Sequence, residues 1–313
     1  MIPVSRFPIF LSRLVTACWL LAVSALAADE PTAALYPDGI HSLDEFAPIP
    51  VLFNGRKMPM DSLARNVLLQ LSGRRSVGGE EASVWLAQLL FEPELASEHK
   101  VFLINHPDVA TALGMEPDPH RRYSYRQLHP PAAKVHELAS KAGELDEKDR
   151  SPVERELIRT YNNLSLYAEL AQSMRFAVPH PDFTVSLPGI RTQLELNPDH
   201  TVFSFYDVYT RGANLQGLIE PLQDRDPSEW SAEEEEGFGI SAALFQWSRQ
   251  AVSRAPTMIP ADPHGQEVWV SPWEMLIISR QDPGINAAME NLVEAVGAYR
   301  GGRQVEFDLA ARN

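Results

Sequence analysis

The sequence predicts a mainly α-helical protein, built of bundle-like helical portions with a few short β-strands. Three segments support this fold class: residues 63–71, 152–176 and 286–299 repeat apolar side chains every three or four positions, the spacing of one helix face. The segments typical of strands are short. The chain has 313 residues, of which 44% are hydrophobic, and this is enough for a substantial core.

Residues 49–75 predict a β-hairpin followed directly by a helix. Residues 50–53 form an apolar run typical of a strand, and the dipeptide of Asn54 and Gly55 is typical of a tight hairpin turn. Arg56 then begins a second extended segment.

The helix after this hairpin has a predicted start and a predicted end. Pro59 blocks helix on its N-terminal side, Asp61 or Ser62 is the expected N-cap, and Gly73 stands where a left-handed C-cap belongs. The side chains expected on its buried face are those of Leu63, Val67, Leu68 and Leu71.

Three further elements are expected in the same portion of the chain. Residues 80–91 predict a helix with a broad apolar face. Residues 101–104 predict a buried strand, which leads to Asn105 as the expected cap of a helix over residues 109–113, and Ser124 is the expected cap of another short helix.

The clearest helix start lies at residue 151. Ser151 and Glu154 have the spacing of a capping box, and Pro152 occupies the first helical position. We expect this helix to bury a single seam. Residues 132–142 have the same period, so the two helices are expected to pack as an antiparallel hairpin.

A Val-Pro-His-Pro break beginning at residue 178 predicts a boundary within the chain. It separates a helical N-terminal portion, residues 49–178, from a mixed α/β C-terminal portion, residues 179–313. In the second portion, residues 183–187 and 201–205 are expected to be strands.

Turns and caps mark the rest of the C-terminal portion. Pro188 with Gly189 predicts a turn, and Ser231 and Ser271 are expected to cap helices. The four consecutive glutamates at residues 233–236 point to different sides of a helix, and we therefore expect no metal site there.

The first residues have the features of an export signal. Residues 1–27 combine basic residues, an apolar stretch and an Ala-Leu-Ala cleavage site, which predicts a signal peptide, and residues 28–48 predict a linker. An alternative is lipidation at Cys18, which would leave the protein tethered to a membrane. We therefore expect an exported, periplasmic protein, either free or membrane-tethered.

Cysteine content and net charge exclude several classes of function. Cys18 is the only cysteine, so a chain cleaved after residue 27 has no thiol for disulfides, thiol exchange, metal binding or covalent haem attachment. The formal net charge of −15 argues against a nucleic-acid partner.

No sequence motif indicates catalysis. The chain has no nucleophile elbow, zinc-protease motif, phosphate-binding loop or dinucleotide fingerprint, and its nine histidines are scattered singly. No catalytic residue, metal ligand or resident cofactor is predicted, and binding is favoured over enzymatic activity.

The candidate binding residues form one main group. Asp61 and Arg65 have the i,i+4 spacing at which an aspartate and an arginine meet on a helix, and Arg56 is expected close to the same corner. The group is expected either to steady the fold or to leave one arginine free to bind an anion.

Weaker candidates lie further along the chain. They are His106 in a Pro-bounded turn and the adjacent Arg121 and Arg122, for which bonds to local backbone and contact with solvent are the favoured alternatives.

The polar set around Arg56 has a recognisable pattern, GR-x-x-P-x-D-S-x-A-R. It resembles the "GR-x-x-P-[LM]-D-[TS]-[FLY]-A-R" segment of the extracytoplasmic region attached to CcsA-type (system II) cytochrome c biogenesis proteins in several bacterial lineages. The matching residues are Gly55, Arg56, Pro59, Asp61, Ser62, Ala64 and Arg65. The resemblance extends more loosely over residues 85–91, 101–108, 121–125, the helix from residue 151, and 292–309.

The resemblance implies a function in binding. In that family, the CcsA-type membrane protein carries the tryptophan-rich haem-handling loop and the transmembrane histidines, and this sequence contains neither. The implied function is an exported accessory or scaffold protein of cytochrome c maturation, acting with a separate integral membrane cytochrome c synthase subunit. Apocytochrome c is a further possible partner, and haem would be reached through the membrane partner.

Two other classes of function remain open at this point. One is an extracytoplasmic enzyme with a dispersed site, such as a hydrolase of envelope polymers. The other is a periplasmic ligand-binding protein. Co-purification with an integral haem-handling protein favours the accessory function, and hydrolysis of a model substrate favours the enzyme.

Overall fold

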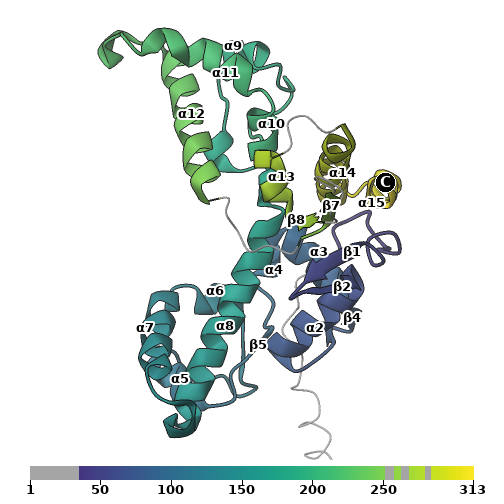
Figure 1. Cartoon of the computed structure of the whole chain (residues 1–313), viewed down its shortest axis with the longest axis vertical. Coiled ribbons are helices and arrows are strands. Elements are labelled where there is room, and N and C mark those ends of the chain that lie inside the picture. Colours follow the sequence, from purple (N-terminus) through teal and green to yellow (C-terminus); the bar gives the residue numbers. More distant parts are fainter. Residues whose placement is uncertain (1–34, 251–256, 262–267, 279–282) are drawn as a thin grey trace, which may run out of the picture. The chain divides into compact units, whose positions relative to one another are not determined.

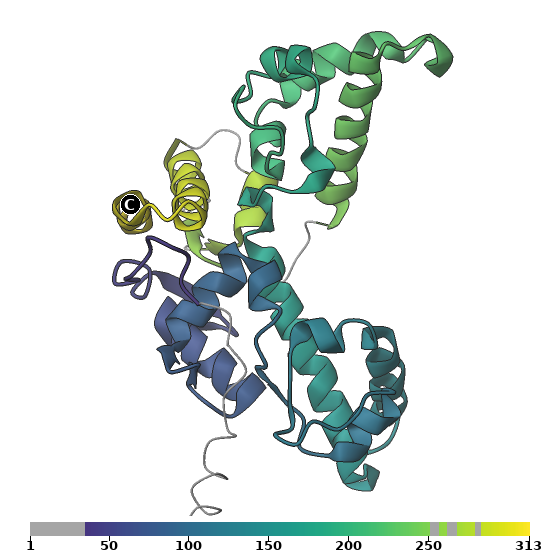
Figure 2. The same ribbon diagram turned by 180° about the vertical axis from the view of Figure 1, so that it is seen from behind.

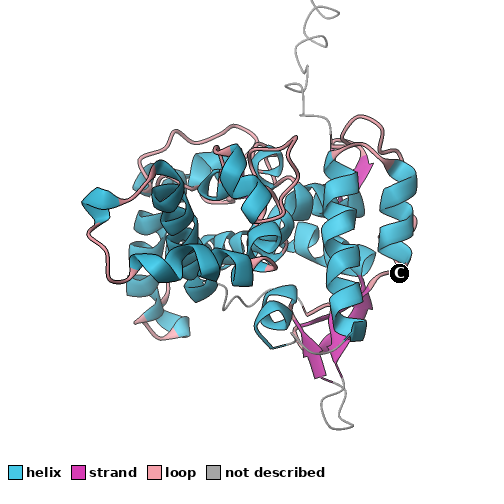
Figure 3. Cartoon of the chain, turned by 90° about the horizontal axis from the view of Figure 1, so that it is seen from above, coloured by secondary structure: helices cyan, strands magenta, loops and turns pink. Residues whose placement is uncertain are grey.

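The computed structural model describes residues 35–250, 257–261, 268–278 and 283–313. The expected signal peptide at residues 1–27, with Cys18, lies outside the described residues. The described residues belong to one compact unit. Helices dominate it and the strands are short, which confirms the mainly α fold class (Figure 3).

The described part of the expected linker is packed into the protein. Leu35, Ile40, Leu43 and Phe46 are all buried members of the main core. A linker would expose such side chains, so residues 35–48 differ from what the sequence indicated. The reason is that helices from the other end of the sequence cover them.

The predicted hairpin is present. Strand β1, Pro50–Phe53, pairs antiparallel with β2, Arg56–Pro59. Asn54 and Gly55 both have positive φ, 49° and 73°, as a tight hairpin turn of the predicted kind requires.

Helix α2, Met60–Ser72, follows β2 without a loop. Its C-cap is Gly73 with φ of 69°, as predicted, but Asp61 and Ser62 are not its N-cap. Instead, the N–H groups of Met60 and Asp61 donate to the carbonyl oxygens of Ile49 (2.8 Å) and Ala47 (3.0 Å). The hairpin brings this backbone to the helix start, so it satisfies N–H groups that a side chain otherwise caps.

A second small hairpin and two helices come next. Strands β3, Ser76–Val77, and β4, Glu80–Glu81, pair antiparallel and lead into α3, Ala82–Phe91, which is buried at every position. Helix α4, Pro93–Ala96, follows immediately. Thus α3 is a central core helix rather than a surface helix with one apolar face.

Strand β5, Phe102–Leu103, pairs with β6, Arg122–Tyr123. Helix α5, Pro107–Ala112, lies between these two strands in the sequence. The short helix α6, Tyr125–Leu128, starts with the predicted cap: Ser124 and Gln127 form a complete capping box.

Helices α7, Ala132–Gly143, and α8, Pro152–Ser173, form the predicted antiparallel hairpin (Figure 1). The capping box of Ser151 and Glu154 is present, with Pro152 at the first position. The buried face of α8 is wider than the expected single seam and includes Thr160, Asn163, Tyr167 and Leu170. The cause is that α8 packs against α3 and α5 as well as α7.

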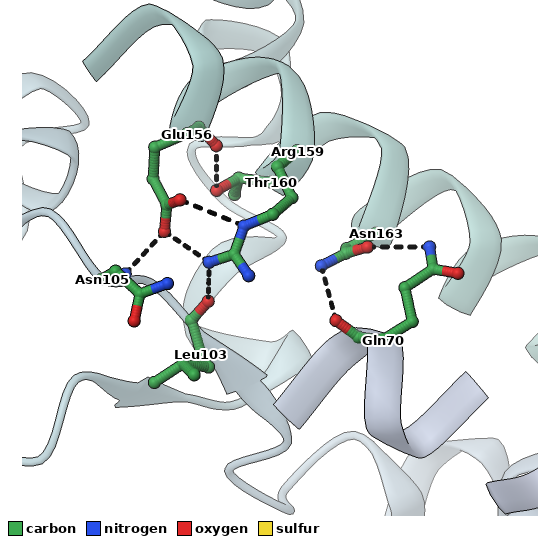
Figure 4. A network of polar contacts seen from close by, with 7 residues as sticks. All are labelled: Gln70, Leu103, Asn105, Glu156, Arg159, Thr160 and Asn163. Carbon is green, nitrogen blue, oxygen red and sulfur yellow. Dashed lines mark hydrogen bonds and ion pairs between the residues drawn. The ribbon is translucent and has the colours of Figure 1, made fainter. Parts of the chain in front are cut away.

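Polar contacts attach the N-terminal half of α8 to β5 and to the loop after it (Figure 4). Glu156 accepts a 2.5 Å hydrogen bond from the backbone N–H of Asn105 and pairs with Arg159, which also donates to the Leu103 carbonyl oxygen at 2.7 Å. Further along α8, Asn163 accepts a 3.0 Å bond from the side chain of Gln70 on α2.

The C-terminal portion is more helical than predicted. Neither expected strand forms. Residues 184 and 202 make one isolated bridge, and a 3₁₀ turn covers Pro181–Phe183. Residue 205 begins a helix because Ser204 caps it through a box with Asp207. The expected turn at residue 188 begins a helix as well.

The helices of this portion are α9, Pro188–Gln193; α10, Phe205–Tyr209; α11, Gly212–Ile219; and α12, Ala232–Gln250. Their shared core is aromatic: Trp247 of α12 lies 5.1 Å from Phe183 and 6.2 Å from Phe205, between ring centroids. Trp273 joins the same cluster, 5.3 Å from Phe205.

Strands β7, Ile259–Ala261, and β8, Val268–Val270, pair antiparallel. Thr257, just before β7, bridges to Leu52 of β1 and so links the β1–β2 pair to the segment that leads into β7. Ser271 and Glu274 form the predicted capping box at α13, Pro272–Ile278.

The last two helices, α14, Pro283–Arg300, and α15, Gln304–Arg312, pack side by side (Figure 2). Tyr299 and Phe307 place their rings against Phe91 of α3, with centroid distances of 5.1 and 6.2 Å. Residues on both sides of the boundary predicted at residue 178 therefore share one core.

Candidate docking site at the hairpin tip

The residues of the GR-x-x-P-x-D-S-x-A-R pattern divide into structural residues and one exposed arginine. Gly55 supplies a positive φ in the turn, and Pro59 is the N-cap residue of α2. Ala64 is completely buried on the core side of α2, where a larger side chain would not fit. These three residues therefore have structural positions in the hairpin and the helix.

Asp61 and Arg65 meet one helical turn apart, as their spacing predicted. Their side chains form an ion pair on α2. Both are partly exposed, with 23% and 46% of the side-chain surface accessible. An ion pair in contact with solvent contributes little to stability, so it mainly fixes the orientation of the Arg65 guanidinium.

Arg56 does not join this pair. It lies at the tip of the hairpin opposite Phe53, whereas Pro59 lies opposite Pro50 at its base. The three residue steps of β2 between Arg56 and Pro59 span about 10 Å at the rise of a strand. The structure therefore brings Asp61 and Arg65 together and holds Arg56 apart from them.

The Arg56 side chain is exposed and, among the residues that the structure describes, makes no ion pair or hydrogen bond. Next to it, Lys57 places its ammonium group 5.3 Å from the ring centre of Trp269 on β8. The hairpin tip thus presents two cations. The guanidinium of Arg56 can bind a carboxylate or a phosphate through two parallel hydrogen bonds.

His106 has a local structural role. It is the N-cap of α5, where its Nδ1 accepts a 3.3 Å hydrogen bond from the N–H of Asp108, so the expected cap, Asn105, is displaced by one residue. The backbone of Asn105 is instead held by Glu156.

Arg121 and Arg122 have different environments. Arg121 is exposed and has a positive φ of 58°, and its carbonyl oxygen accepts the N–H of Ile104. Arg122 donates a 3.0 Å hydrogen bond to the carbonyl oxygen of Ser72, the last residue of α2. Burial, and then the nearby Arg74, lowers the pKa of the Arg122 guanidinium. Arg122 therefore donates to a carbonyl oxygen that would otherwise lack a partner at the C-terminus of α2.

The four glutamates at the start of α12 are not grouped for metal binding. Glu234 completes a capping box with Ser231 and pairs with Arg225, and Glu236 accepts hydrogen bonds from the N–H groups of residues 186 (2.7 Å) and 187 (3.1 Å). Within the described ranges, no cluster of three or more potential metal ligands occurs.

Comparisons with known proteins assign no family. No protein-family model matches the chain, and the search of curated protein sequences returns no significant match. Within the described part of the chain, none of the helices has both the length and the apolar character required to cross a bilayer.

Proposed function

We propose that this protein is an exported accessory or scaffold protein of system II cytochrome c maturation. It acts by binding, beside a separate CcsA-type integral membrane protein that handles haem. Apocytochrome c is a further partner in this proposal, and the protein reaches haem only through the membrane partner. The proposal rests first on the resemblance of residues 55–65 to the extracytoplasmic region of that family.

The observation that carries the proposal is the different environment of the two arginines in the pattern. Arg65 forms an ion pair with Asp61, so a contact within α2 already accounts for it. Arg56 is held at a hairpin tip, exposed and without a described partner, so folding alone does not require a guanidinium there. A docking contact with an anionic group, either a carboxylate of the partner or a propionate of haem held by the partner, accounts for an arginine at this position.

The test compares full-length variants in cells that lack the native copy. Arg56→Ala removes the proposed contact, and Arg56→Lys keeps the charge but loses the bidentate geometry. Arg75→Ala is the matched control, since Arg75 is also exposed but lies outside the pattern. The measurements are haem staining of c-type cytochromes, co-purification with the CcsA-type protein, and thermal unfolding of each purified variant.

We expect Arg56→Ala to weaken co-purification about tenfold or more, which is the usual effect of losing a charge-assisted hydrogen bond, and to lower mature cytochrome c. Arg56→Lys should be intermediate, and all variants should unfold at the wild-type temperature. If Arg56→Ala and Arg75→Ala give the same cytochrome yield, the docking proposal is wrong.

A further inference from the structure

An apolar pocket of about 390 Å³ opens where residues 45–50 meet helices α14 and α15. Three aromatic rings form part of its wall, those of Phe46, Phe91 and Phe307, which contact one another with centroid distances of 5.6 to 6.4 Å. Met174 and Met258 add flexible thioether side chains. The pocket is thus lined mainly by groups that cannot hydrogen-bond.

The space exists because small side chains stand where the helices face each other. Ala288 and Ala295 line it from α14, two turns apart, and Ala310 lines it from α15. Leucine at these positions would fill the volume, as in a close-packed interior. A pocket of this size falls within the range of small-molecule sites.

The mouth of the pocket is polar and carries both signs of charge. Arg312 donates a 2.6 Å hydrogen bond to Glu45, and Asn291 lines the pocket from α14. The ion pair raises the pKa of the Arg312 guanidinium through its hydrogen bond to Glu45. Arg312 has five N–H donors, so it retains others to offer to a ligand.

We infer that this pocket binds the hydrocarbon chain of a single-chain zwitterionic amphiphile, with the head group at the Glu45–Arg312 pair. The phosphate of such a head group pairs with Arg312, and its ammonium group pairs with Glu45. A purely anionic head group fits less well because it meets the Glu45 carboxylate.

The volume sets the length of the chain. A methylene group takes roughly the share of volume of a water molecule in the liquid, about 30 Å³, so the pocket accommodates about a dozen carbons. Each methylene that enters adds about 0.8 kcal/mol of transfer free energy, or about fourfold in affinity. Affinity should therefore rise steeply with chain length and stop rising once the pocket is full.

This inference does not depend on the proposed function. The pocket lies at the base of the hairpin, with Pro50 in its lining, whereas Arg56 occupies the tip. Loss of amphiphile binding and loss of cytochrome c maturation can therefore be measured separately.

The first experiment needs no variant. Hexyl-, decyl-, dodecyl- and hexadecylphosphocholine are titrated into the full-length protein below their critical micelle concentrations, and binding is followed by calorimetry. We expect saturable binding of one molecule per chain, with affinity rising about a thousandfold or more from six to twelve carbons and little further to sixteen. Absence of saturable binding, or a rise that continues unchanged beyond twelve carbons, would overturn the inference.

The second experiment fills the pocket. Ala288→Phe places a ring in it, while Ala287→Phe, at the exposed neighbouring position of α14 and outside the lining, is the matched control. Ala288→Phe should weaken dodecylphosphocholine binding at least tenfold, and Ala287→Phe should leave it unchanged. Equal effects of the two substitutions would place the binding elsewhere.

The third experiment tests the head group. Wild-type protein should bind dodecylphosphocholine more tightly than dodecanoate, and Glu45→Gln should strengthen dodecanoate binding because it removes the opposing carboxylate. If Glu45→Gln leaves dodecanoate affinity unchanged, the head group does not lie at the Glu45–Arg312 pair.

Discussion

The backbone at Gly302 passes so close to that of Asp38 that a Cβ atom on Gly302 would lie 1.9 Å from the Asp38 carbonyl oxygen. Gly302 also has a φ of 65°, in the left-handed region that favours glycine. The turn between α14 and α15 is thereby held against the segment that precedes the hairpin. This contact helps to explain why residues 35–48 are packed rather than extended as a linker.

Gly302→Ala should destabilise the protein by more than about 2 kcal/mol, because a left-handed alanine costs about 1–2 kcal/mol and the backbone of Asp38 must also move. Gly114→Ala is the control: its φ is 74°, but its added Cβ meets no atom within 4 Å. Urea denaturation measures both variants. Equal losses for the two would show that the close approach to Asp38 has no energetic effect.

Glu156 is expected to contribute more to stability than an exposed carboxylate, because only 11% of its side-chain surface is accessible. Replacing it with alanine leaves the Asn105 N–H and the Arg159 guanidinium without their carboxylate partner, and the free energy of unfolding should fall by about 1–3 kcal/mol. The comparison is Glu137→Ala on α7, whose exposed carboxylate contacts only Lys134 and Lys141 among the described residues. Chemical denaturation should show little change for Glu137→Ala, and a similarly small change for Glu156→Ala would contradict the prediction.

The ion pair of Asp61 and Arg65 should contribute little to stability. A double-mutant cycle of Asp61→Ala and Arg65→Ala is expected to give a coupling energy below about 1 kcal/mol, which decreases with added salt, because both side chains contact solvent. The reference measurement is the same cycle at high salt. A larger coupling energy that does not change with salt would contradict this prediction and would show that the ion pair stabilises the fold.

His99 should make stability depend on pH. It is buried, with its Nε2 2.6 Å from Oε1 of Gln88, and burial lowers its pKa below the ordinary value of 6.5. Between the folded and the unfolded pKa, the unfolded state binds more protons, so stability falls as the pH drops below about 6.5. Above that pH, both states are neutral and the contribution is constant.

The test is urea denaturation at several pH values between 5 and 8. His99→Gln should reduce the loss of stability on acidification, and His200→Gln, at an exposed position, is the control substitution. If the stability of His99→Gln fell more steeply on acidification than that of the wild type, the prediction from burial would have the wrong sign.

The candidate site was only partly predictable. The i,i+4 spacing of Asp61 and Arg65 determines their ion pair, because both residues lie on one helix. The position of Arg56 depends on how far β2 continues before α2 begins, and the sequence placed Arg56 too near that corner. The pocket could not be predicted from the sequence. Alanines such as Ala288 and Ala310 are common in helices, and they line a pocket only because of how α14 and α15 pack.

The sequence by itself determined the elements whose stabilising contacts are local. Examples are the capping box of Ser151 and Glu154, the turn of Asn54 and Gly55, and the left-handed cap at Gly73. Each joins residues at most a few positions apart, so the residue types and their spacing are sufficient.

Only the tertiary structure decided the features made by distant residues. The carbonyl oxygens of Ala47 and Ile49 replace a side-chain cap for α2, and the strand expected at residues 183–187 is reduced to a single bridge at Thr184. Burial of residues 35–48 depends on α14 and α15, which lie far along the chain. Such contacts depend on how far each neighbouring element extends and which face it presents, and local propensity does not encode these properties.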